Sequence, residues 1–240
     1  MIKEKRLLII GLCVLVIVVG ITTYFLIPKE KQIDYAPNDE MLFKKEYELI
    51  NGKSNNDKEY LLLEIKEDTG VKYIGPDEAV ELIANGNGII YFGFPTCPWC
   101  RNMLPVLLNA LESNGINKFY YMNILDIRST YVLDGDNKPK IENEGTVGYY
   151  KILDVLKDKL TDYTLTISEG KKAGEKVKTG ELRLFAPTVV FVRDGIIVDI
   201  HIGTVESQTD PHIPLTKEQK EELNEIFTNG IKKVNAESCN

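Results

Sequence analysis

The 240-residue sequence has few cysteines, tryptophans and histidines: four, one and two copies. Four cysteines are too few for a small domain held together by disulfides, and their uneven spacing excludes a zinc module built from two cysteine pairs. A basic surplus is also missing, since 29 Lys and Arg face 36 Asp and Glu, which argues against a nucleic-acid binder with a broad basic face. Internal repeats and low-complexity segments are absent, and 43% of residues are hydrophobic. A disordered or collagen-like chain is therefore excluded.

Charge is absent from residues 7–27, which are enough for a helix to cross a hydrocarbon core of ~30 Å. Lys3, Lys5 and Arg6 precede this run, and Pro28 with mixed charges follows it. Basic residues on the short leading side favour a cytoplasmic location for residues 1–6. The sequence therefore predicts a single transmembrane anchor, with the C-terminal remainder outside the cell.

Two alternatives apply to this run. A cleaved signal peptide usually has a shorter apolar core and a small-residue cleavage site, and neither is present here. Lipid attachment at Cys13 fits poorly because Leu12 precedes it, so Cys13 is most simply a small apolar residue of the anchor. Beyond residue 27, 26 basic residues face 35 acidic ones, so the anchor rather than surface charge is expected to hold the protein at the membrane.

The rest of the chain predicts an α/β domain. Residues 28–54 form a juxtamembrane tether with a short helix at 39–50, residues 55–235 form the domain, and 236–240 form a tail. We expect strands at 60–65, 71–74, 88–94, 118–124, 163–167, 182–185, 188–193 and 196–202, and helices at 75–86, 101–115, 148–160 and 216–234. Residues 126–142 are expected to be polar and turn-rich.

Three local patterns support these elements. The continuous apolar run at 88–94 is typical of a strand buried on both faces of a central parallel sheet. Asp194-Gly195 between two apolar runs predicts a β-hairpin. Thr216 with Gln219 predicts a capping box at the start of the last helix.

Cys97 and Cys100 lie where the buried strand at 88–94 gives way to a helix. The free N–H groups and the positive dipole end of that helix favour a thiolate at Cys97, and the thiolate is the nucleophilic form. Cys100 lies one helical turn further on, so its sulfur can reach that of Cys97. We expect a redox-active pair, with Cys97 the exposed nucleophile of low pKa and Cys100 the buried resolving thiol. No metal or organic cofactor is required.

Other interpretations of these residues remain open. The pair forms half of a zinc site if Cys239, His201 and His212 supply further ligands, or it forms a purely structural disulfide. Trp99, between the cysteines, is either an exposed aromatic contact for substrate or a residue packed against its own loop.

Three features in this order carry a family resemblance. They are the Cys97-Pro-Trp-Cys100 motif after a strand, Pro105 within the following helix, and Ala186-Pro187 before a hairpin and a final helix. The chain resembles the thioredoxin superfamily over about 71–125 and 185–234. The resemblance implies a thioredoxin-like mixed β-sheet flanked by helices. It also implies that Pro187 is cis and faces the cysteines, and that the backbone at Ala186 pairs with an extended substrate peptide. An ordinary trans proline opening a strand is the alternative.

Three features narrow this resemblance: the membrane anchor, the segment Phe92-Gly-Phe-Pro-Thr-Cys-Pro-Trp-Cys-Arg101, and an insertion at about 126–184 that is expected to hold one helix and a hairpin. With these features, the chain is similar to membrane-anchored thioredoxin-like proteins of Gram-positive bacteria, which are related to the bacteriocin transport accessory group. The expected function is extracytoplasmic thiol–disulfide exchange, with Cys97 and Cys100 as catalytic residues and Trp99, Ala186 and Pro187 binding substrate. The expected partners are protein thiols and disulfides, the membrane and a redox partner within it. A non-catalytic accessory or binding module is the alternative.

The chain departs from the family at two positions. Ordinary thioredoxins carry a buried acid six residues before the first cysteine, where this chain has Tyr91, and Tyr121 stands where a partnering lysine is common. The resemblance therefore implies that Cys100 needs another proton acceptor, such as water or a backbone group.

Overall fold

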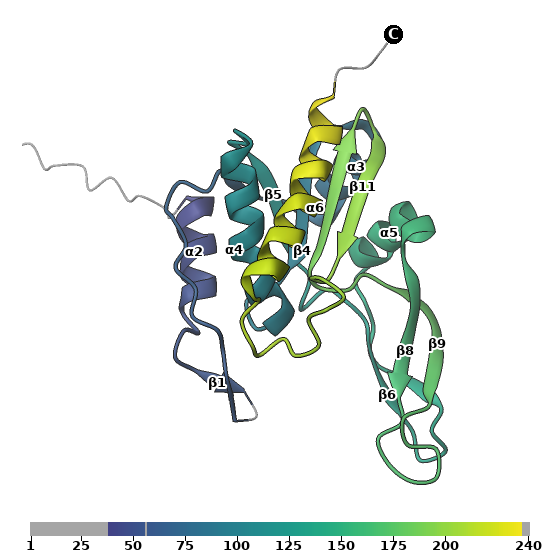
Figure 1. Ribbon diagram of the computed structural model, residues 1–240. Coiled ribbons are helices and arrows are strands. Elements are labelled where there is room, and N and C mark those ends of the chain that lie inside the picture. The colour runs from purple at the N-terminus through teal and green to yellow at the C-terminus, as the bar shows by residue number, and fades with distance from the viewer. Residues whose placement is uncertain (1–37, 56, 237–240) are drawn as a thin grey trace, which may run out of the picture. The chain divides into compact units, whose positions relative to one another are not determined.

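The computed structural model describes residues 38–55 and 57–236 (Figure 1). The predicted cytoplasmic residues 1–6, the anchor at 7–27, residues 28–37 of the tether and residues 237–240 lie outside the described part. Among the described residues, no helix is both long and apolar enough to cross a membrane.

The described residues form a mixed α/β fold, which confirms the predicted class. The helices are α2 (Asp39–Glu48), α3 (Pro76–Asn85), α4 (Pro98–Ser113), α5 (Val147–Leu156) and α6 (Lys217–Asn235), with a 3₁₀ turn at Lys157–Lys159. The strands are β1 (Ser54–Asn55), β2 (Lys58–Glu59), β3 (Val71–Tyr73), β4 (Gly88–Gly93), β5 (Phe119–Asn123), β6 (Thr130–Leu133), β7 (Pro139–Asn143), β8 (Thr161–Thr166), β9 (Lys176–Arg183), β10 (Thr188–Arg193) and β11 (Ile196–Ile202).

A five-stranded mixed sheet in the order β11-β10-β4-β5-β3 forms the centre of the fold. Strands β3, β4 and β5 are parallel, whereas β10 runs antiparallel to both β4 and β11. The apolar runs of β4 and β10 are buried at nearly every position, as expected for strands covered on both faces. Helix α4 packs against α6, α6 lies on β10 and β11, α2 lies on β3, and α3 packs against α5 (Figure 1).

Local signals in the sequence explain where several elements begin. Helix α3 starts at Pro76, whose missing N–H costs nothing in the first turn. The predicted capping box of α6 is confirmed: the Thr216 hydroxyl accepts from the Gln219 N–H, and the Gln219 side chain accepts from the Thr216 N–H. Asp194 and Gly195 both have positive φ and join β10 to β11 as a hairpin, as predicted.

The predicted strand at 60–65 is wrong. Side chains, rather than a neighbouring strand, form the hydrogen bonds to the backbone N–H and C=O groups of this segment. The Asn51 amide exchanges two hydrogen bonds with Leu63, the Ile65 N–H donates to Glu48, and Arg101 donates to the Leu61 carbonyl. Leu63 and Ile65 are therefore buried without any β-pairing, whereas Leu62 is exposed.

The segment at 126–184 holds one more hairpin than predicted. Residues 126–142 contain β6 and β7, joined by a tight turn in which the Asp134 carboxylate accepts from the N–H groups of Asp136 and Lys138. Helix α5 follows, and then the hairpin of β8 and β9. Strand β9 begins at Lys176, six residues before the expected strand at 182–185, and Leu184 and Phe185 lie beyond its end.

Candidate active site at the cysteine pair

Cys97 is the N-cap residue of α4, where the chain leaves β4. Its backbone is extended, with φ −80° and ψ 116°, and its sulfur accepts a hydrogen bond from the Cys100 N–H at 3.2 Å. The Cys97 thiol also donates to the carbonyl oxygen of Ala186 at 3.4 Å. Free N–H groups and the positive end of the helix dipole meet at this position, so it stabilises a thiolate at Cys97.

Both cysteines are buried thiols in this structure. Cys97 is 5% exposed and Cys100 is fully buried. The prediction of an exposed Cys97 is wrong, because the segment containing Ala186 lies directly against its sulfur. The predicted burial of Cys100 is confirmed.

The pKa values of the two thiols differ in the predicted direction. The Cys100 thiol donates to the Cys97 sulfur and lowers the pKa of Cys97; the N–H groups of Cys100 and Trp99 and the charge of Arg128 add to this effect, and burial opposes it. Burial raises the pKa of Cys100 well above its ordinary value, and the neighbouring Cys97 raises it further. Cys97 is therefore the more acidic thiol.

The peptide bond between Ala186 and Pro187 is cis, as predicted. It lies beside the cysteine pair, since the Ala186 carbonyl contacts Cys97. The Pro187 carbonyl accepts from the Gly203 N–H at 2.8 Å, and the Thr188 hydroxyl donates to the Phe185 carbonyl at 2.7 Å. These bonds fix the backbone next to Cys97.

Trp99 lines an open groove of about 360 Å³ next to the pair. The other walls come from Phe185, Ala186, Ile202, Gly203, Thr204, Val205, Glu206 and Gln208. The Phe185 and Ile202 side chains are 38% and 36% exposed, whereas Trp99 is half-buried and partly packed against the core. Trp99 is therefore partly packed and partly exposed, and its contact with substrate stays a prediction.

The scattered histidines make local contacts elsewhere. The His201 ring bonds to the Thr204 carbonyl at 2.9 Å and packs edge-on against Phe227, and burial lowers its pKa. The His212 N–H donates to Asp210, and Cys239 lies outside the described residues. Within 38–55 and 57–236, no three His, Cys, Asp or Glu side chains gather as a metal site would require.

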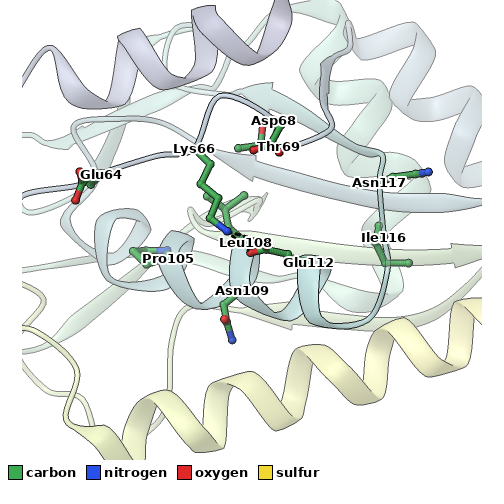
Figure 2. A pocket seen from close by; sticks show the side chains of 10 residues that line it. All are labelled: Glu64, Lys66, Asp68, Thr69, Pro105, Leu108, Asn109, Glu112, Ile116 and Asn117. Carbon is green, nitrogen blue, oxygen red and sulfur yellow. Dashed lines mark hydrogen bonds and ion pairs between the residues drawn. The ribbon is translucent and has the colours of Figure 1, made fainter.

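Another hollow, of about 460 Å³, lies between residues 64–69 and the C-terminal half of α4 (Figure 2). The exposed ion pair of Lys66 and Glu112, 2.6 Å long, crosses it. Its lining residues include no cysteine and no histidine, so the cysteine pair remains the candidate site.

Comparisons of the chain with protein-family models, with curated proteins and with solved structures found no match. The functional argument therefore depends on the residues of this chain and their geometry.

Arg128 is a candidate site residue that the sequence analysis missed. Its guanidinium lies over the ring of Phe94, 4.6 Å from the ring centroid, and Phe94 is three residues before Cys97 in the sequence. The positive charge of Arg128 lowers the pKa of Cys97. Its own pKa is lowered by burial and by the charge of Arg183. The sequence did contain a signal for Arg128. Cys97 follows β4 and Arg128 follows β5, and the carboxyl ends of these two parallel strands meet at one edge of the sheet.

We expect Arg128→Gln to slow alkylation of Cys97 severalfold at pH 7. Loss of the cation removes a stabilising charge from the thiolate, so the pKa of Cys97 rises and less thiolate is present below that pKa. The measurement is the alkylation rate against pH for reduced protein carrying Cys97 as its single thiol. Arg128→Lys, which keeps the charge, should stay close to the parent. Slowing of equal size at high pH, where both proteins are fully ionised, would point to blocked access instead.

Proposed function

We propose that the chain is a thiol–disulfide oxidoreductase, with Cys97 the nucleophile and Cys100 the resolving thiol. One observation carries the proposal: the Cys97 sulfur lies at the N-terminus of α4, bonded to the Cys100 N–H and against the Ala186 carbonyl beside a cis proline. The unequal acidities of the two thiols support the same division of roles.

The reaction proceeds through two exchanges. The Cys97 thiolate attacks one sulfur of a substrate disulfide, that bond breaks, and the other substrate sulfur leaves as a thiolate. Cys100 then loses its proton and attacks the Cys97 sulfur, which forms the Cys97–Cys100 disulfide and releases the second substrate thiolate. The substrate disulfide is reduced and the cysteine pair is oxidised; the reverse sequence oxidises a substrate dithiol.

The groove beside the pair supports protein substrates. Trp99, Phe185 and Ile202 give it an apolar wall, and Ala186, which precedes the cis proline Pro187, also lines it. We propose that an extended substrate segment lies here with its disulfide over Cys97.

The finer fold that we propose is thioredoxin-like. The order of the motifs in the sequence and the mixed sheet with helices packed on it support this fold. The proposed location is the outer face of the membrane, supported by the uncharged run at 7–27.

The burial of Cys97 favours a second candidate function. A thiol that is 5% exposed suits a docking module or a structural clip, in which the cysteines serve the fold alone. The reduction potential of the pair separates the two functions, because structural disulfides resist reduction by glutathione whereas catalytic ones are labile.

Trapping tests the proposed function. We expect Cys100→Ser to accumulate a mixed disulfide between Cys97 and substrate protein, because the serine cannot displace the bound sulfur. Mass spectrometry of membranes from cells expressing the full-length variant should identify the linked partner. The double variant with Cys97→Ser should trap nothing, and equal trapping by both variants would contradict the assignment of Cys97.

A further inference from the structure

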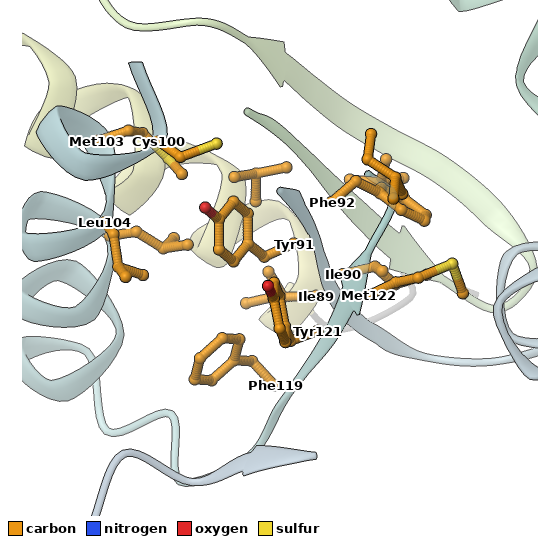
Figure 3. Close-up of a cluster of buried hydrophobic side chains, with 14 of the residues drawn as sticks. Ile89, Ile90, Tyr91, Phe92, Cys100, Met103, Leu104, Phe119, Tyr121 and Met122 are labelled. Atoms are coloured by element: carbon orange, nitrogen blue, oxygen red, sulfur yellow. The ribbon is translucent and has the colours of Figure 1, made fainter. Parts of the chain in front are cut away.

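The side of the cysteine pair that faces the core is closed to a substrate. Cys100 lies against fully buried side chains of β4 and α4, among them Tyr91 and Leu104 (Figure 3). The hydroxyl oxygens of Tyr91 and Tyr47 are 2.8 Å apart, so α2 covers this region as well. A substrate therefore has to approach from the opposite side, where the groove lined by Trp99 lies.

A tight turn forms one wall of that groove. The Gln208 N–H donates to the Val205 carbonyl at 3.0 Å, which closes a turn with Glu206 and Ser207 at its centre. The side chain of Gln219, in the first turn of α6, donates to the Ser207 hydroxyl at 3.1 Å. The backbone on both sides of Glu206 is therefore held in place.

Glu206 is the single charged side chain among the described residues that line the groove. It is exposed, and within the part of the chain that the structure describes it forms no ion pair. The guanidinium groups of Arg128 and Arg183 lie over the rings of Phe94 and Tyr163 instead, and neither arginine lines the groove. The Glu206 carboxylate is therefore free to bind a cation.

Two further lining side chains leave hydrogen-bonding atoms unused. Thr204 and Gln208 are 8% and 7% exposed, and among the described residues Thr204 Oγ1 and Gln208 Oε1 are buried without a hydrogen-bond partner. Gln208 Nε2 donates to the Ile213 carbonyl at 3.2 Å, which leaves the amide oxygen as the unpaired end. Buried polar atoms are rarely left unpaired in folded proteins, and the negative partial charge of this oxygen adds to the charge of Glu206. The polar part of the groove therefore favours a positively charged group.

The apolar part of the groove suits the rest of such a group. Phe185 and Ile202 are 38% and 36% exposed, and Trp99 is half-buried beside them. A lysine or arginine side chain has a hydrocarbon stem that packs on apolar surface and a charged end that stays in water. An aromatic face also attracts a cation. A glutamate or aspartate would meet the Glu206 carboxylate without any compensating cation in the lining.

We propose that this groove selects substrate proteins that carry a lysine or arginine close to the reacting cysteine, and that Glu206 recognises the positive charge. The inference rests on the proposed function, because the reacting cysteine has to lie over Cys97. Side chains two residues apart share one face of an extended segment. The basic residue is therefore expected two positions before or after the substrate cysteine.

Peptide disulfides test this selection. The probes are short peptides, each with one cysteine and joined in pairs by a disulfide, that carry Lys, Gln or Glu two positions before or after the cysteine. They are reduced by the full chain with Cys13 and Cys239 replaced by serine, and each rate is divided by the rate with a small free thiol, which cancels the effect of the charge on the disulfide itself. We expect the Lys peptide to react about fivefold faster than the Glu peptide at low salt, with Gln between them. The difference should shrink at high salt.

Three variants separate the groove from general charge effects. Glu206→Gln should remove most of the preference for Lys, and Glu206→Lys should reverse it. Glu225→Gln is the matched control, because it removes the same charge from an exposed position of α6 that does not line the groove, and it should keep the preference.

Two results would overturn the inference. One is an equal loss of preference in Glu206→Gln and Glu225→Gln, which would show that the acidic charge of the whole domain attracts the substrate. The other is reduction of all peptides at equal rates by the parent. Failure of the parent to reduce any of the peptides would instead contradict the proposed function.

Discussion

Replacement of Cys97 by serine is expected to lower the rate of disulfide exchange by at least ~10³-fold, as for loss of other enzyme nucleophiles. Among the described residues, Cys97 is the only thiol that lies at the N-cap of a helix and has a lowered pKa. Cys100 cannot take over, because burial raises its pKa and keeps it protonated. The measurement is reduction of a protein disulfide by the full-length chain under fixed thiol supply.

The control for this experiment replaces the other two cysteines. Cys13 and Cys239 stand far from the motif in sequence, so the double variant with serine at both positions should retain full exchange. Substantial exchange by Cys97→Ser would show that Cys100 is the attacking thiol and would reverse the assignment.

A large effect on stability is expected for Gly195→Ala. Gly195 has φ +71°, and a Cβ there would lie 2.2 Å from the backbone oxygen of Ala84 at the end of α3. A side chain in this conformation costs about 1–2 kcal/mol, and forcing two backbones apart adds about 1–3 kcal/mol. We expect a loss of roughly 3 kcal/mol, or about 6–12 °C in Tm, measured by thermal unfolding followed by circular dichroism.

Gly115→Ala separates the two causes. Gly115 has the same φ, +71°, but no atom lies within 4 Å of the position its Cβ would take. This variant should lose only the conformational part, about 1–2 kcal/mol. Equal losses in the two variants would show that α3 yields easily and that the close approach at Gly195 costs nothing.

The sequence predicted the elements whose signals are local. The apolar run of β4, the Asp194-Gly195 turn and the Thr216 capping box each depend on neighbouring residues, and all three are confirmed. The segment at 60–65 was mistaken for a strand because its apolar pattern fits one. Its backbone is instead satisfied by side chains such as Asn51 from elsewhere in the chain, and no local pattern shows this.

The same distinction applies to the candidate site. The motif and the strand-to-helix turn indicated the pair and the lower pKa of Cys97, both of which follow from the start of one helix. The contact of Ala186 with Cys97, the charge of Arg128 and the Tyr47–Tyr91 hydrogen bond join segments between 31 and 89 residues apart in the sequence. Burial of Cys97 follows from such a contact, which is why the sequence misjudged its exposure.

Trp99 gives the molecule a built-in optical reporter. It is the single tryptophan of the chain and lies between the two cysteines in the sequence. Its side chain is half-buried and lines the groove. Sulfur atoms and disulfides close to an indole quench its emission, so oxidation of the pair should change the fluorescence of the whole protein through this one side chain. A substrate segment entering the groove should shift the emission as well, since it displaces water from the exposed part of the ring. Redox state and occupancy can therefore be followed without any added label.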